Sequence, residues 1–284
     1  MEAETTARGA IKPSLVRAIG LGKTYVQRAP FSRKQFAIDA LVGAELEVPK
    51  ASLTALVGES GSGKSTLARC LALMERADCG EIWFEGKEIS RCIARELASL
   101  RPLIQMVHQD SAQALNPRFT AAQIVAEPLL IQRCEKGPGL QARACELMEE
   151  VGLPAKWADR RPSEFSGGQR QRLAIARAIA LKPAFLILDE SLSGLDQSTQ
   201  AQILNLLMDL QQAYSLTYLL ISHDLSLVGQ VADFVAVMYQ GRIVEHGPRR
   251  EIVANPRHSH TRALLQSVRL AESNFRTAQA GGRQ

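Results

Sequence analysis

The stretch GESGSGKST, residues 58–66, decides the fold expected for this chain. It follows a short apolar, β-prone run, Leu53–Val57, and precedes a run with helical character at residues 67–73. Strand, glycine-rich turn and helix form the context in which the pattern G-x-x-x-x-G-K-[ST] marks a phosphate-binding loop. The sequence therefore predicts a site for a nucleoside triphosphate.

Each residue type in this loop suits a triphosphate. Gly58, Gly61 and Gly63 allow backbone conformations in which successive N–H groups point at one anion. The helix that begins after Gly63 adds free N–H groups and the positive end of its dipole. Lys64 supplies a full charge for the β- and γ-phosphates, and the Ser65 hydroxyl is a hard ligand for Mg²⁺. The other residues of the predicted ATP-binding loop are Glu59, Ser60, Ser62 and Thr66.

The composition is ordinary for a globular protein. The chain has 284 residues, 46% hydrophobic and 22% charged, with a formal net charge of +5. Its basic residues are spread along the chain, which favours general affinity for phosphates over nucleic-acid binding. No window of about 18 apolar residues is present, and residues 1–10 lack the apolar core of a secretory signal. The five cysteines form no C-x-x-C pair, so we expect reduced, mostly buried thiols.

Apolar periodicity predicts an α/β fold. Strands are expected at residues 15–21, 41–48, 53–57, 81–85 and 104–110, and later at 185–190, 217–221, 234–238 and 242–245. The last two should pair as a hairpin around Gln240 and Gly241. Helical spacing at residues 120–131 and 140–151, with a further helix at 170–181, indicates a helical insertion in the α/β core.

Carboxylates follow the run FLILDE at residues 185–190, which lacks alternation and suits a central strand buried on both faces. Ligands bind at the carboxyl ends of strands in such sheets. Asp189 is therefore expected to hold Mg²⁺ through water, and Glu190 to polarise the attacking water. The alternative is an acidic pair that caps a helix. His223 follows the next apolar strand at the same sheet edge.

Two further features could take part in nucleotide binding. Tyr25, in Gly-Lys-Thr-Tyr, could stack on a base, although a half-buried tyrosine at a strand end fits as well. The run Phe-Ser-Gly-Gly-Gln at residues 165–169 leads into a helix, so its backbone N–H groups could receive an anion.

In this order, the motifs GESGSGKST, Gln109, FSGGQ, FLILDE, SGLD at residues 193–196 and His223 resemble the nucleotide-binding subunit of an ATP-binding cassette (ABC) transporter. The resemblance runs from about residue 14 to 248. It implies a P-loop NTPase fold: a RecA-like core with an antiparallel β subdomain, plus an inserted α-helical subdomain at about residues 103–180. It also implies ATP hydrolysis with Mg²⁺.

The resemblance further implies a head-to-tail dimer of cassettes around two ATP molecules. One subunit would supply the phosphate loop, and its partner the signature and interface residues Ser166, Gly167, Gly168, Gln169 and Asp196. Tyr25 would stack on adenine and His223 would contact the γ-phosphate. Gln109 would sense Mg²⁺, and Ser65, Gln109 and Asp189 form the implied metal set. Catalysis would rest on Glu190, His223 and Lys64.

A closer resemblance is to the dipeptide, oligopeptide and nickel importer ATPases. It rests on IQMVHQDSAQALNPR at residues 104–118 and on a carboxyl extension at 249–270. It implies two integral-membrane permeases, an extracytoplasmic solute-binding protein, a second cassette of the same or another kind, and a place on the cytoplasmic side of the inner membrane. His108, Phe165 and Gly194 depart from the family pattern. No cysteine follows Cys145, so no iron–sulfur cluster is expected.

Three points stay open in the sequence. His258 and His260 form a His-x-His, which we interpret as a solvated loop and not a metal site. Residues 271–284 are expected to be a disordered tail. A cassette ATPase could instead serve a soluble complex, as in phosphonate degradation, or nucleic-acid metabolism, although no nucleic-acid partner is expected.

Overall fold

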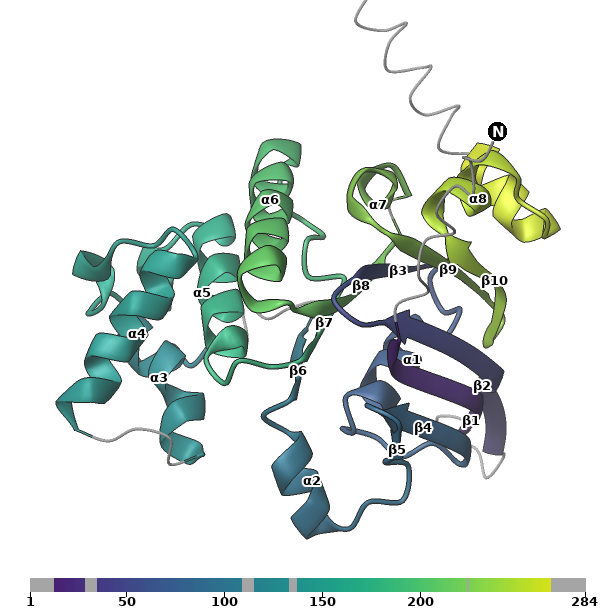
Figure 1. Ribbon diagram of the computed structural model, residues 1–284, viewed down its shortest axis with the longest axis horizontal. Helices are drawn as coiled ribbons and strands as arrows, with labels where there is room; N and C mark the ends of the chain where they lie inside the picture. Colours follow the sequence, from purple (N-terminus) through teal and green to yellow (C-terminus); the bar gives the residue numbers. More distant parts are fainter. Residues whose placement is uncertain (1–12, 29–34, 109–114, 133–136, 224, 267–284) are drawn as a thin grey trace, which may run out of the picture.

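The computed structural model describes residues 13–28, 35–108, 115–132, 137–223 and 225–266 (Figure 1). Within these ranges the strands form a six-stranded and a four-stranded sheet. The larger sheet contains, in spatial order, β10 (Arg242–Pro248), β9 (Phe234–Tyr239), β3 (Leu53–Val57), β8 (Thr217–Ser222), β7 (Phe185–Asp189) and β6 (Ile104–Val107). The smaller contains β2 (Gln35–Pro49), β1 (Ser14–Arg28), β4 (Cys79–Phe84) and β5 (Lys87–Glu88).

The larger sheet is parallel except for β10, which pairs antiparallel with β9. Its central strand β7 is buried along its whole length because both faces are covered. Phe185 and Ile187 pack into a core with α1 (Lys64–Leu71) and the four-stranded sheet, whereas Leu186 and Leu188 pack into a second core with the helices. The expected central strand and the β9–β10 hairpin are confirmed.

Helices cover the other face of the larger sheet, with α3 (Ala121–Ile131), α4 (Pro138–Glu150) and α5 (Gly167–Ile179) on one side of the molecule and α6 (Gln197–Tyr214) beside β7 (Figure 1). The predicted limit of the helical subdomain at residue 103 is wrong, because β6 is an edge strand of the parallel sheet.

Within the helical part of the molecule, Phe165 is buried and packs edge to face against Trp157, with ring centroids 6.0 Å apart.

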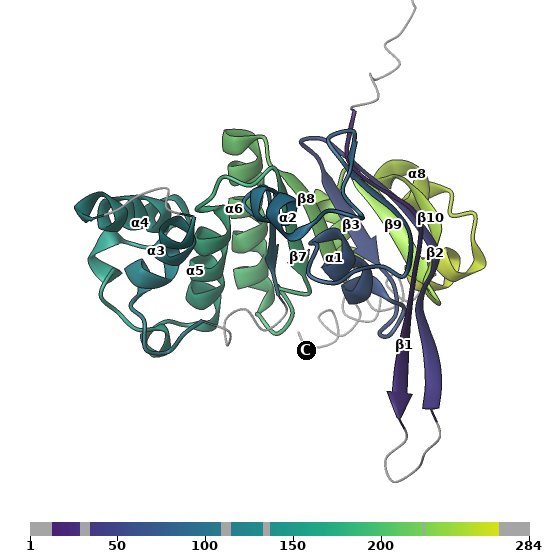
Figure 2. The same cartoon turned by 90° about the horizontal axis from the view of Figure 1, so that it is seen from below.

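The antiparallel sheet carries a long hairpin arm. Strands β1 and β2 pair from Ser14 with Pro49 out to Arg28 with Gln35, and the arm extends beyond the body of the molecule (Figure 2). We expected a polar connection between two shorter strands. Instead, polar residues such as Thr24 and Asp39 pair with each other across the arm, with a hydroxyl-to-carboxylate hydrogen bond of 2.8 Å. Tyr25 therefore lies within a strand.

The remaining helices are short. They are α2 (Ala94–Leu100), α7 (Leu225–Val231), α8 (Arg249–Ala254) and the 3₁₀ turns η1 (Ala155–Trp157) and η2 (Pro162–Glu164), with residues 259–266 also helical. Residues 271–284, for which we expected disorder, lie outside the described residues. Among the helices described, none has both the length and the apolar character needed to cross a bilayer.

Candidate nucleotide site

The loop after β3 wraps around the first turn of α1. Gly63 is in the left-handed region, with φ 106°, and a Cβ there would lie 2.3 Å from the carbonyl oxygen of Ala40. Only glycine fits such a position. The carbonyl oxygen of Ser62 accepts a hydrogen bond of 2.9 Å from the N–H of Gly241, so the β9–β10 turn supports the loop.

Lys64 lies in the fold of this loop. Its side chain is buried, and its ammonium group donates to the carbonyl oxygens of Gly58 and Glu59, each at 2.8 Å. Burial lowers the pKa of Lys64, while the nearby carboxylates of Glu190 and Asp189 oppose that shift. The charge is thus held inside the loop, with Glu59, Ser60 and Gly61 exposed around it.

The Ser65 hydroxyl donates to Asp189 Oδ1 at 3.0 Å. Asp189 is buried, and its pKa is raised by that burial, although the Ser65 hydrogen bond acts in the opposite direction. The pair brings together a hydroxyl and a carboxylate that lie 124 residues apart in the sequence. Two such hard oxygen donors in a site lined by backbone N–H groups fit a magnesium ion bound with phosphate.

Glu190 and His223 follow the neighbouring strands β7 and β8 and line one cavity of about 100 Å³. Glu190 has φ 44°, a conformation that non-glycine residues adopt rarely and that often marks a functional site. Its backbone is held by two hydrogen bonds: its N–H donates to Ile221 at 3.1 Å, and its carbonyl oxygen accepts from the Ser193 hydroxyl at 2.6 Å. The predicted carboxylate and histidine therefore share one sheet edge with the phosphate loop.

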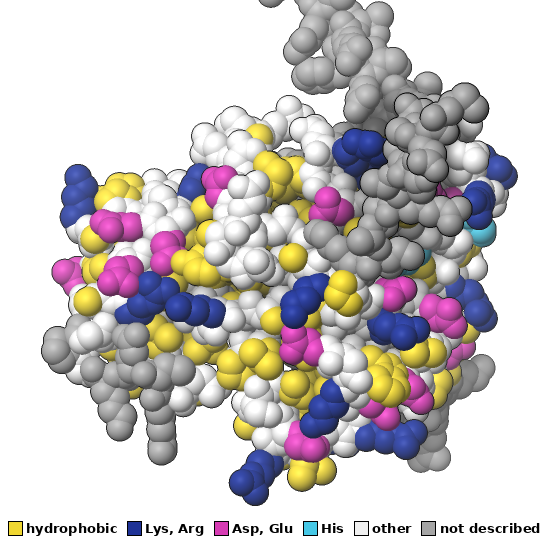
Figure 3. Space-filling model, in the orientation of Figure 1, with side chains coloured by type: hydrophobic (Ala, Val, Ile, Leu, Met, Phe, Trp, Pro, Cys, Tyr) yellow, Lys and Arg dark blue, Asp and Glu magenta, His cyan; other side chains and the backbone are white. Residues whose placement is uncertain are grey.

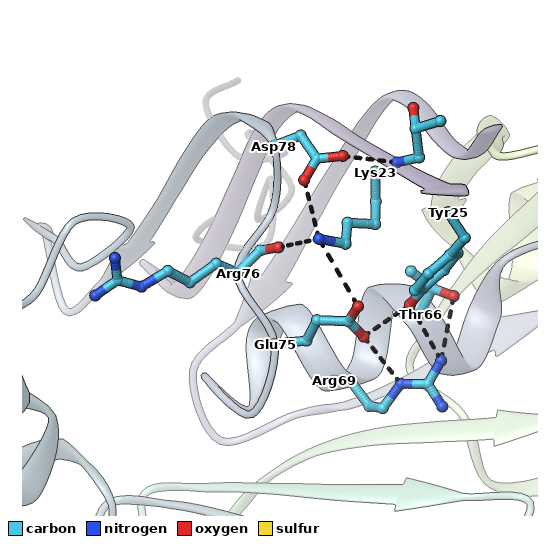
Figure 4. A network of polar contacts seen from close by, with 8 residues as sticks. Lys23, Tyr25, Thr66, Arg69, Glu75, Arg76 and Asp78 are labelled. Atoms are coloured by element: carbon cyan, nitrogen blue, oxygen red, sulfur yellow. Dashed lines mark hydrogen bonds and ion pairs between the residues drawn. The ribbon is translucent and has the colours of Figure 1, made fainter. Parts of the chain in front are cut away.

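Tyr25 is half-buried at the start of the hairpin arm, and its hydroxyl is tied to the segment after α1 (Figure 4). This tether was not predicted, because Glu75 lies 50 residues further along the chain than Tyr25. The relevant signal in the sequence is a pair of opposite charges, Arg69 on α1 and Glu75 after it, which could form an ion pair.

The segment at residues 165–169 is the start of a capped helix. The hydroxyl of Ser166 accepts from the N–H of Gln169 at 3.3 Å, and the side chain of Gln169 accepts from the N–H of Ser166 at 2.9 Å. Ser166 is exposed. In the part of the chain that the structure describes, no hydrogen bond or ion pair joins this segment to the phosphate loop of the same chain.

Asp196 caps α6. Its carboxylate accepts from the backbone N–H of Thr199 at 2.9 Å and from the Ser198 and Thr199 hydroxyls at 2.6 and 2.7 Å. These bonds hold its pKa well below the usual range. From the sequence we expected only an interface role for Asp196 and did not predict the cap, although Asp before Gln-Ser-Thr is a typical helix start. Gln109 lies outside the described residues.

Comparison with known proteins shows the family of the chain. The family model for the ABC transporter matches residues 41–193. A dipeptide transport ATP-binding protein, DppF, of Haemophilus influenzae is 43% identical over 263 residues, which are 92% of this chain and 80% of that protein. A glutathione import ATP-binding protein, GsiA, of Escherichia coli is 48% identical over 217 residues, 76% of this chain and 35% of that protein.

A solved structure has the same fold. The dimeric post-hydrolysis state of the ATP-binding cassette MJ0796, bound to ADP and Pi, superposes with a TM-score of 0.71 at 26% identity over 83% of this chain and 99% of that chain. The chain belongs to the ABC transporter family and is an ATP-binding cassette ATPase with the P-loop NTPase fold.

Proposed function

We propose that this chain is the ATP-hydrolysing subunit of an importer for peptides or a related small solute. The observation that carries the proposal is its 43% identity to a dipeptide transport ATP-binding protein over 92% of the chain, which includes the carboxyl extension beyond the cassette. The cassette fold alone would allow other functions, because one fold hosts many of them.

In this proposal the nucleotide lies along the carboxyl edge of the parallel sheet. Adenine stacks on Tyr25, and the phosphates enter the loop at residues 58–66, where Lys64 turns from the loop carbonyls to the β- and γ-phosphates. Glu190 accepts a proton from the attacking water, and His223, across the same cavity, donates a hydrogen bond to the γ-phosphate.

Ser65 and Asp189 would hold Mg²⁺, with Gln109 as the third proposed member. The hydroxyl and the buried carboxylate already lie 3.0 Å apart, and a cation between them would favour the ionised form of Asp189 that burial disfavours. When bound with ATP, the ion neutralises charge on the β- and γ-phosphates. Hydrolysis should therefore require Mg²⁺.

A second cassette would complete the site. At the start of α5, the backbone N–H groups of Gly167 and Gly168 have no acceptor in a preceding helical turn, whereas those of Ser166 and Gln169 are bonded in the capping box. We propose that these groups bind the γ-phosphate held by the partner's loop, with Asp196 at the edge of the contact. ATP would join the two surfaces, and loss of the γ-phosphate would separate them. The partner could be a copy of this chain or a related cassette.

The permease would contact the groove between the core and the helical subdomain. A cavity of about 560 Å³ lies there between β6, the end of α1, α3 and α5. Met74 and Ile131 line it with more than half of their surfaces exposed, and hydrophobic side chains are visible on this face (Figure 3). Exposed apolar groups around a groove suit a segment of a partner protein. The place of action is then the cytoplasmic side of the inner membrane, with two permeases and an extracytoplasmic solute-binding protein.

The proposal is tested by purifying tagged Glu190→Gln protein from its native membrane with ATP and Mg²⁺. Recovery of two multi-spanning permeases with a second cassette supports the importer. Recovery of soluble enzymes or nucleic acid in their place would leave the ATPase assignment standing and contradict the transport role.

A further inference from the structure

The hydroxyl of Tyr25 is held by two charged side chains. It donates to Glu75 Oε2 at 2.7 Å, and it accepts from Arg69 Nη2 at 3.4 Å (Figure 4). Both the donor and one acceptor capacity of the phenol are thus used inside the protein. The ring of Tyr25 is fixed from its outer end as well as from its backbone.

Glu75, the acceptor for the Tyr25 hydroxyl, forms further ion pairs. Glu75 also pairs with Arg69 Nε at 3.3 Å and with Lys23 Nζ at 3.8 Å. Three residues further along the chain, Asp78 accepts from Lys23 Nζ at 2.9 Å and from the N–H of Thr24 at 2.7 Å. Three consecutive residues of β1, Lys23 to Tyr25, are therefore bonded to the segment at residues 75–78.

Arg69, the donor to the Tyr25 hydroxyl, belongs to the helix that follows the phosphate loop. Arg69 lies in α1, and its Nη2 also reaches the hydroxyl of Thr66 at 3.5 Å, one turn towards the phosphate loop. Lys64 and Ser65 stand in the first turn of the same helix. The ring that would receive the base and the groups that would receive the phosphates are thus placed relative to one rigid element.

One face of the ring is occupied. The ammonium group of Lys23 lies 5.8 Å from the ring centroid of Tyr25, over its face. Tyr25 remains half-exposed, so the opposite face is the one on which a base would stack. Lys23 in turn stays charged, because its hydrogen bond to Asp78 raises its pKa.

We infer that Glu75 and Arg69 are positioning residues for nucleotide recognition: they fix the ring of Tyr25 against α1, so that base and triphosphate bind to one preformed frame. This rests on the proposed stacking of adenine on Tyr25 and assigns two residues that do not themselves touch the nucleotide. An unanchored ring would have to be ordered on binding, and ordering one such side chain weakens affinity by about two- to ten-fold.

The test compares ATP with inorganic triphosphate, which has no base, by titration calorimetry on the full chain. Tyr25→Phe keeps the ring and removes the anchored hydroxyl, and Glu75→Ala removes the anchor. Each should weaken ATP binding by about two- to ten-fold and leave triphosphate binding unchanged. The double variant should be no weaker than the worse single variant, because both changes break one bond. Glu146→Ala, which removes an exposed ion-pair partner of Arg143 in the helical subdomain, is the matched control.

The outcomes separate this inference from the stacking on which it rests. If Tyr25→Ala weakens ATP binding but Tyr25→Phe binds ATP like the wild type, stacking stands and the anchor is overturned. If Tyr25→Ala leaves ATP affinity unchanged, both fall. Equal loss of ATP and triphosphate affinity in Glu75→Ala would mean a general structural role and would also overturn the inference. Should Glu75→Ala fail to fold, Tyr25→Phe decides alone.

Discussion

The phosphate loop and the start of α5 satisfy their polar groups in different ways. In the loop, Lys64 and the Ser65–Asp189 pair are bonded across distant parts of the chain, and both Lys64 and Asp189 are buried. At the start of α5, the side chains of Ser166 and Gln169 cap each other's backbone N–H groups, and Ser166 is exposed. The first region is organised by contacts between distant residues; the second is a self-capped helix end that has Gly168 close to Thr199 of α6 and Ser166 exposed. We therefore expect the start of α5 to act through contact with another molecule.

The largest effect on hydrolysis should come from a change at Glu190, on the side of the site that carries the phosphate loop. Glu190→Gln should lower the hydrolysis rate by about a hundred-fold or more while ATP still binds, because the amide cannot accept the proton of the attacking water. Phosphate release and retention of labelled ATP measure the two properties separately. Normal hydrolysis by this variant would remove Glu190 from the proposed role of base.

Lys64→Ala should act on binding itself. It removes a buried charge from the phosphate loop, and charge-assisted hydrogen bonds to phosphate are strong, so ATP affinity should fall about ten- to a hundred-fold. Calorimetric titration measures the affinity, and Lys50→Ala, which breaks an exposed ion pair with Glu85, is the matched control. Wild-type affinity in Lys64→Ala would contradict the role given to the loop.

A change on the helix side should separate binding from turnover. A Cβ at Gly168 would lie 2.4 Å from Cγ2 of Thr199, whose hydroxyl is bonded to Asp196. Gly168→Val should therefore displace the start of α5, leave ATP affinity close to wild type and reduce hydrolysis by about ten-fold or more. An equal loss of ATP affinity would show that the two regions are not separable in this way.

The smallest effect concerns the cap of α6. Asp196→Ala removes three hydrogen bonds at the N-terminus of α6 and should lower Tm slightly near neutral pH. Because the pKa of Asp196 is depressed in the folded state, its contribution is complete above the ordinary value of 3.8 and is lost as pH falls through the folded pKa. Thermal unfolding of both proteins from pH 7 to 3 checks this. A gap that stays constant below pH 3.8 would contradict the assignment.

Local signals predicted the parts of the molecule that depend on short stretches. The unbroken apolar run at Phe185–Asp189 identified a central strand because it must be buried on both faces. The phosphate loop was predicted from its motif between a strand and a helix, and Glu190 from its place at the end of an apolar strand; both lie at one edge of the sheet. The roles proposed for Lys64, Ser65 and Glu190 follow from their chemistry at those positions, and the roles of the partner cassette's residues rest on the family resemblance.

Other features depend on contacts between distant residues. The hairpin arm was predicted too short, because its polar residues are paired with each other and not with the core. The anchor of Tyr25 uses Glu75, and nothing near Tyr25 in the sequence points to that partner. The edge strand β6 was assigned to the helical subdomain because its four residues carry no signal of which sheet they join.

The central claim is that the loop binds ATP alone but needs the start of α5 from a second cassette to hydrolyse it. The most direct measurement is ATP turnover per chain against chain concentration, with mass determined by light scattering in the same samples. We predict that monomers bind ATP without turnover, and that turnover appears only with a dimer of this chain or with its partner cassette. A monomer that hydrolyses ATP at the same rate at every concentration would contradict it.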